Sequence, residues 1–170
     1  MTKAEQNEFT RQAVKEQVLS NPAYAGTRKL ILILMCIPSA FFVADRILAL
    51  VLGGLSGGNG FGWIWGIFIM AMIVVTAINA QTVTAAVFLF ITAVFNIGTV
   101  LYYTLSYSWS ALNGGILIFE LLWAAAAVAV GIVLLANGRI RAYHAHYKAV
   151  LTGAQNEAKQ TGAAGDKFNS

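Results

Sequence analysis

Residues 30–52 read LILILMCIPSAFFVADRILALVL, an apolar run long enough to cross a lipid bilayer as a helix. At 1.5 Å per residue this helix would be roughly 34 Å long, against a hydrocarbon core of about 30 Å. The run nevertheless contains Asp45 and Arg46 side by side, about four residues or roughly 6 Å beyond its midpoint. Each charge at the centre of a span costs about 2.5–3.5 kcal/mol on insertion scales. We therefore expect another part of the chain to provide partners for these two side chains.

The composition of the whole chain is that of an integral membrane protein. Of its 170 residues 58% are hydrophobic and only 11% are charged, whereas soluble domains carry about 25% charged residues. So few charges cannot cover a water-facing surface. The length allows one domain and leaves no room for a second folded one.

Four apolar segments predict an all-α bundle of four transmembrane helices, each near the roughly 20 residues that a spanning helix needs. The segments are residues 30–52, 61–80, 82–103 and 112–136. The connections after the first and third segments contain no Lys or Arg, whereas both tails do. Because positive residues mark cytoplasmic loops, we expect the N- and C-termini on the cytoplasmic side.

The two tails have different predicted structures. Residues 1–29 form a cytoplasmic segment that we expect to be helical, with Asn21 and Pro22 as cap and first-turn residue of the first span. Residues 137–151 carry apolar side chains at helical spacing and predict an amphipathic juxtamembrane helix. Residues 152–170 lack such a stripe and are predicted to be disordered.

Several large aromatic residues fall at one predicted level near the non-cytoplasmic surface. Trp and Tyr side chains gather at membrane interfaces, which predicts an interfacial belt of Trp63, Trp65, Tyr102, Tyr103 and Trp109. The small size and the lack of an Asn-x-Ser/Thr acceptor favour a multi-pass protein of the bacterial plasma membrane.

The costliest polar residues of three predicted spans lie at almost the same depth: Asp45, Arg46, Asn96 and Glu120. Glu120 is the predicted partner of Arg46. Because adjacent helical residues point about 100° apart, Asp45 should face a different neighbour, either Asn96 or a second subunit. We expect this intramembrane polar cluster to be a hydrogen-bonded contact that fixes helix register, a proton or cation site, or a cluster that a partner helix completes.

Small residues mark the predicted helix contacts. Gly62 and Gly66 form a Gly-x-x-x-Gly pair, a signal for close packing of helices in membranes. Ala127 and Gly131 fall within about 20° of Glu120 on the helical wheel, so one face of the last span is small and polar.

The sequence lacks the motifs of common enzymes, and we expect no enzymatic activity and no cofactor. It contains no Cys/His cluster, phosphate loop or nucleophile elbow, and His144 and His146 point to different faces of a helix, so no metal site is predicted. Nucleic acid is not an expected partner, because the basic residues cluster beside apolar runs. Expected partners are the lipid bilayer and either the chain itself or a larger membrane complex.

Two functional hypotheses remain. In the first, the chain is a non-enzymatic accessory or scaffolding subunit of a membrane assembly, and the polar cluster fixes helix packing. In the second, it is a small oligomeric transporter or channel in which Asp45 or Glu120 exchanges a proton or a cation, since intramembrane ionisable groups commonly mark such pathways.

Overall fold

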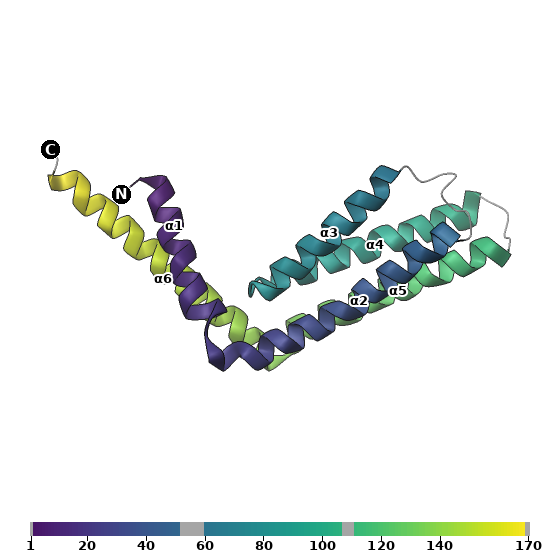
Figure 1. The fold of residues 1–170 in the computed structure, drawn as a ribbon, viewed down its shortest axis with the longest axis horizontal. Helices are drawn as coiled ribbons and strands as arrows, with labels where there is room; N and C mark the ends of the chain where they lie inside the picture. The colour runs from purple at the N-terminus through teal and green to yellow at the C-terminus, as the bar shows by residue number, and fades with distance from the viewer. Residues whose placement is uncertain (1, 52–59, 107–110, 169–170) are drawn as a thin grey trace.

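The computed structural model describes the backbone of residues 2–51, 60–106 and 111–168, and the side chains of residues 2–48, 66–102, 104–105 and 117–161. This part of the chain is all-helical, as predicted. The main helices are α1 (Lys3–Val14), α2 (Ala25–Val51), α3 (Gly60–Ile78), α4 (Thr82–Ser106), α5 (Ala111–Ala136) and α6 (Gly138–Phe168). Helices α2 to α5 run together as a bundle, while α1 and α6 pair into an arm that leaves one end of it (Figure 1). We call this end of the bundle the arm end.

Three helical segments are long and apolar enough to cross a membrane, namely Pro22–Leu48, Thr82–Tyr102 and Leu117–Ala136. They belong to α2, α4 and α5. The apolar segment of α3 that falls among the described side chains, Gly66–Ile78, is shorter. These three helices support the membrane character that the composition predicts.

Each bundle helix buries one narrow face. On α2 the buried residues recur every three or four positions, the periodicity of a single helical face, and are Ile31, Met35, Pro38, Phe42 and Asp45. The opposite faces expose large apolar side chains, among them Ile33 on α2, Val94 on α4 and Ile118 on α5. Exposed apolar faces on every side of a bundle suit contact with lipid tails rather than with water.

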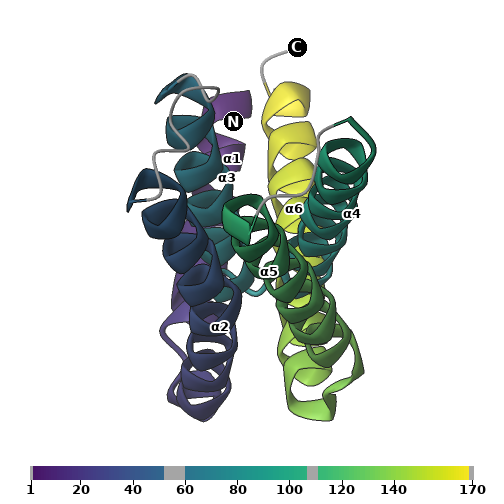
Figure 2. The ribbon, with the colours of Figure 1, turned by 90° about the vertical axis from the view of Figure 1, so that its right-hand side faces the viewer.

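Helices α3 and α4 are joined by a tight turn at the arm end, and they diverge toward the other end (Figures 1 and 2). Ala80 ends α3 in the left-handed conformation, with φ of 65°, a position that glycine usually fills. The N–H of Gln81 bonds the carbonyl of Thr76, and the N–H of Ala80 bonds that of Ala77. These bonds make a Schellman motif, which turns the chain back within a few residues.

The arm is built from the two ends of the chain. A π-helical turn (Lys15–Leu19) and a short 3₁₀ helix (Pro22–Tyr24) connect α1 to α2. The side chain of Asn21 accepts a hydrogen bond from the N–H of Ala23, and Pro22 occupies the first turn, so the predicted cap is confirmed. Val18 and Tyr143 are fully buried between the arm helices and the bundle.

Helix α6 is longer than predicted and includes residues 152–168, for which the sequence predicted disorder. The helix continues to Phe168. Ala154 and Ala158 are buried on the same face as the half-buried Val150, at the four-residue spacing of one helical face. Alanine favours helix strongly, and α1 packs along α6 (Figure 1). Alanine residues spaced along a polar helix do not mark a packing surface in the sequence, so this contact was not predicted.

Candidate functional site: a charged layer between two helices

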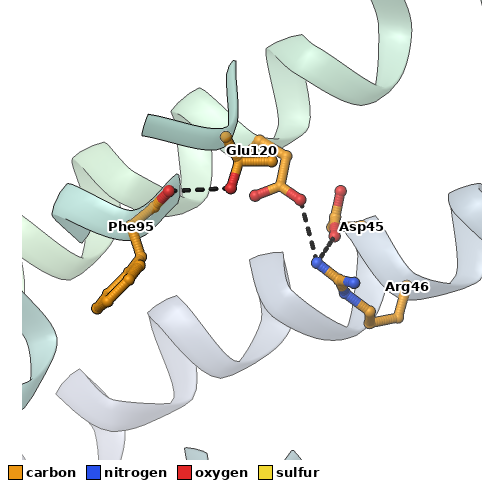
Figure 3. Close-up of polar contacts among 5 residues, drawn as sticks. Asp45, Arg46, Phe95 and Glu120 are labelled. Carbon is orange, nitrogen blue, oxygen red and sulfur yellow. Dashed lines mark hydrogen bonds and ion pairs between the residues drawn. The ribbon is translucent and has the colours of Figure 1, made fainter. Parts of the chain in front are cut away.

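A cluster of three charged side chains, which we call the charged layer, joins α2 to α5. The Nη2 atom of Arg46 lies 2.8 Å from Oδ2 of Asp45 and 3.0 Å from Oε1 of Glu120 (Figure 3). Asp45 and Glu120 are buried, and the Arg46 side chain is 26% exposed. One guanidinium nitrogen therefore binds two carboxylates that come from different helices.

The polar atoms of the charged layer are not all paired. Within the described residues, Oδ1 of Asp45, Nε of Arg46 and Oε2 of Glu120 are buried without a hydrogen-bond partner. A buried polar atom without a partner costs about 1–3 kcal/mol. These three atoms can therefore form additional hydrogen bonds. With all three groups ionised, the charged layer has a net charge of one negative unit.

Aromatic rings pack on the arginine side of the layer. The guanidinium carbon of Arg46 lies 5.5 Å from the centre of the Phe42 ring, within the range of a cation–π contact. The Phe42 ring lies 5.1 Å from that of Trp123 on α5. It also comes within 3.1 Å of the position that a Cβ at Gly66 would occupy. Because Gly66 has no side chain, it leaves space for the Phe42 ring that packs against Arg46.

Asp45 and Asn96 do not lie as the sequence suggested. Asp45 was expected to face Asn96 or a second subunit; within the chain, its carboxylate binds the neighbouring Arg46. Asp45 and Arg46 leave the helix in directions about 100° apart. The long Arg46 side chain folds back along the helix, so its guanidinium group still reaches the Asp45 carboxylate. Asn96 on α4 is buried, yet its Nδ2 has no partner among the described residues, and no hydrogen bond within this part of the chain joins it to the charged layer.

The predicted packing residues have different surroundings. Ala127 is fully buried on α5. A Cβ at Gly131 would come within 2.8 Å of the Phe90 ring of α4, so this glycine permits a close approach of the two helices. Gly62 and the aromatic residues Trp63, Trp65, Tyr103 and Trp109 fall outside the described side chains. Tyr102 is exposed on α4.

A second polar cluster lies at the arm end and was not predicted. Three side chains of α6 bind the α3–α4 turn, and we call this cluster the clasp. The hydroxyl of Tyr143 donates to the carbonyl of Ile78 at 3.3 Å. Nδ1 of His144 donates to the carbonyl of Ala80 at 2.7 Å, and Nε2 of Gln81 donates to the hydroxyl of Tyr147 at 3.1 Å.

The clasp supplies partners for carbonyl groups that the end of α3 leaves free. Burial raises the pKa of the Tyr143 hydroxyl above its ordinary value, and the charge of Arg28 partly counteracts this. The second ring nitrogen of His144, Nε2, is buried without a partner in the described part of the chain. Ordinary neutral residues that bind backbone carbonyls give no signal in a sequence, which is why the clasp was missed.

Comparisons with known proteins give no further assignment. No family model, curated protein or solved structure matches the chain. Within the described residues, no group of three His, Cys, Asp or Glu side chains could hold a metal ion. The chemistry of the site therefore rests on its own geometry, which is an ion-pair bridge between two apolar helices with unpaired acceptor atoms.

Proposed function

We propose that the chain is a four-span protein of the plasma membrane with both termini in the cytoplasm. The fourth span is α3, whose 19 residues would extend about 28 Å at 1.5 Å per residue. Both chain ends lie in the arm, on one side of the bundle (Figure 1), which supports an even number of crossings. The basic residues of the two tails support the cytoplasmic assignment of that side.

We further propose that the protein is a non-enzymatic accessory or scaffolding subunit of a membrane assembly. The observation that carries this proposal is the binding of both Asp45 and Glu120 by one nitrogen of Arg46. The charged layer is then a structural contact that holds α2 against α5 in one register. The exposed apolar faces of the bundle remain available to another copy of the chain or to a larger membrane protein.

The substitution Glu120→Gln tests the scaffold proposal. It removes one of the two carboxylates and leaves Arg46 paired only within its own helix. We expect a reduced yield of assembled protein, measured by size-exclusion chromatography with light scattering after extraction from the membrane. The matched control is Ser39→Ala, because the Ser39 hydroxyl donates only to the carbonyl of Met35 in the same helix. The control should assemble normally.

A second candidate function is proton- or cation-coupled transport by an oligomer of the chain. The specific observation in its favour is that Oδ1 of Asp45 and Oε2 of Glu120 are buried acceptors without partners. These atoms could take a proton or a cation. In this case Glu120→Gln assembles normally but loses pH-coupled flux in liposomes. Unchanged assembly and unchanged flux would contradict both functions.

A further inference from the structure

A cleft of about 1220 Å³ separates the arm from the arm end of the bundle. One wall is formed by α1, the π-helical turn and α6, and the other by Asn79 and Gln81 of the α3–α4 turn. Tyr147, which belongs to the clasp, also lines it. The cleft is at least as large as the pockets of roughly 300–1,000 Å³ that bind small molecules.

The charges of the arm are distributed unevenly around its two helices. The cleft is lined by four basic side chains (Lys3, Arg11, Lys15 and Lys159) and by two acidic ones (Glu8 and Glu16). A second groove of about 620 Å³ follows a different side of the same helix pair. Its described lining includes Glu16 and Glu157 but neither Lys nor Arg. The lining of the cleft therefore carries a net positive charge, whereas the described lining of the second groove carries a net negative one.

Three basic residues of α6 share one face of this helix, and one of them, Lys159, lines the cleft. Arg141, Lys148 and Lys159 are spaced by seven and eleven residues, which places them on one face of the helix. All three are exposed, and no ion pair joins them to any described carboxylate. His144, on the edge of this face, binds the carbonyl of Ala80 in the α3–α4 turn. The edge of this basic face is thus in contact with the α3–α4 turn at the arm end of the bundle.

We propose that this cleft and the basic face of α6 bind the headgroups of anionic phospholipids. Phosphate oxygens accept hydrogen bonds from Lys and Arg, and clusters of basic residues beside a transmembrane helix attract an anionic lipid surface. The amides of Asn79 and Gln81 offer further polar contacts at the wall nearest the membrane. Leu151 and Val14, which also line the cleft, provide apolar surface for the beginning of the lipid tails.

This proposal rests on the proposed membrane orientation, in which the arm lies at the cytoplasmic surface, where anionic lipid is concentrated. It is independent of whether the chain acts as a scaffold or as a transporter. The amount of each bound lipid is measured after extraction into detergent, so it does not depend on how the chain is oriented in a cell membrane. Failure of the lipid proposal is thereby distinguishable from failure of the proposed function.

The test compares lipids retained by the full-length chain. The protein is reconstituted in vesicles of equal parts phosphatidylglycerol and phosphatidylcholine, extracted in mild detergent, and its bound lipids are quantified by mass spectrometry. We expect phosphatidylglycerol to be enriched. Lys15→Gln with Lys159→Gln should lower the enrichment about three- to tenfold, because each basic residue near an anionic surface contributes to binding.

The control is Lys29→Gln with Arg139→Gln, which removes the same charge from two exposed residues that do not line the cleft. It should retain the enrichment. No enrichment in the unmodified chain, or an equal loss in both pairs, would overturn the proposal, the latter because it would indicate diffuse attraction by net charge.

A second measurement uses the unmodified chain and does not depend on the folding of variants. A photoactivatable phosphatidylglycerol with its reactive group near the phosphate should cross-link to peptides of α1, α6 or the α3–α4 turn that line the cleft. Cross-links confined to other parts of the chain would overturn the assignment of the site.

Discussion

The charged layer and the clasp hold helices together by different means. In the charged layer, Arg46 binds two carboxylates within apolar helices, where an unpaired charge costs several kcal/mol. In the clasp, the Tyr143 and His144 side chains of α6 bind the carbonyls at the end of α3, and a typical hydrogen bond of this kind contributes about 0.5–1.5 kcal/mol. The comparison indicates that loss of one side chain should cost more in the charged layer than in the clasp.

The largest expected effect is the loss of the arginine in the charged layer. Arg46→Met leaves Asp45 and Glu120 buried without a cation, and breaking a buried ion pair costs about 3–5 kcal/mol. The free energy of unfolding in mixed micelles, measured by titration with sodium dodecyl sulfate, should fall by about this amount. Arg28→Met is the control, because Arg28 lies outside the charged layer and its side chain donates a long hydrogen bond of 3.5 Å to the Val18 carbonyl. An equal loss of unfolding free energy in the two variants would show that Arg46 contributes no more than a basic residue outside the charged layer.

An intermediate effect is expected where α4 and α5 approach most closely. Gly131→Leu would push against the Phe90 ring, and overpacking of this kind costs about 1–3 kcal/mol. Gly98→Leu is the control, since within the described residues no atom of another helix lies within 4 Å of the position that a Cβ would occupy there. Phe90→Ala in the Gly131→Leu background should recover part of the loss in the same unfolding measurement. If Gly98→Leu is as destabilising as Gly131→Leu, the close approach to Phe90 is not the reason that position 131 needs a glycine.

The smallest effect concerns the clasp and depends on pH. Because the folded state raises the pKa of Tyr143, docking of the arm is fully stable below about pH 10, the ordinary tyrosine value, and weakens as the pH rises above it. The distance between spin labels at Ala145 on α6 and Thr84 on α4, in a Cys36→Ser background, should increase under these conditions.

Tyr143→Phe is the matched variant for this titration. It lacks the titrating hydroxyl and should lose about 1 kcal/mol of docking energy at neutral pH, without a further change at alkaline pH. A label distance that responds to pH in the same way in both proteins would show that another group controls the arm.

The sequence predicted the parts of the molecule that involve large free energies. An apolar run that contains Asp45 and Arg46 demands a partner, and Glu120 was identified because it was the remaining charge at the same depth. The all-helical architecture followed from segment length and composition. By contrast, the fold of Arg46 back onto Asp45 depends on a flexible side chain, whose conformation a helical wheel does not describe.

The arm was predicted less completely, for a related reason. The helix after residue 151 is stabilised by Ala154 and Ala158 against α1, and small residues on a polar helix resemble a disordered segment in composition. The clasp joins Tyr143 and His144 to backbone carbonyls about 65 positions away. Any residue has such a carbonyl, so the sequence carries no mark of these contacts.

The most direct test of the central claim, that Arg46 and Glu120 hold α2 against α5, is a double-mutant cycle. The free energies of unfolding of Arg46→Met, Glu120→Gln and the double variant are measured against the unmodified chain in the same micelles. Residues in direct contact show interaction energies of about 0.5–3 kcal/mol, and we predict a coupling of at least about 1 kcal/mol for this pair. Additivity within about 0.3–0.5 kcal/mol, which is typical of independent sites, would contradict the account.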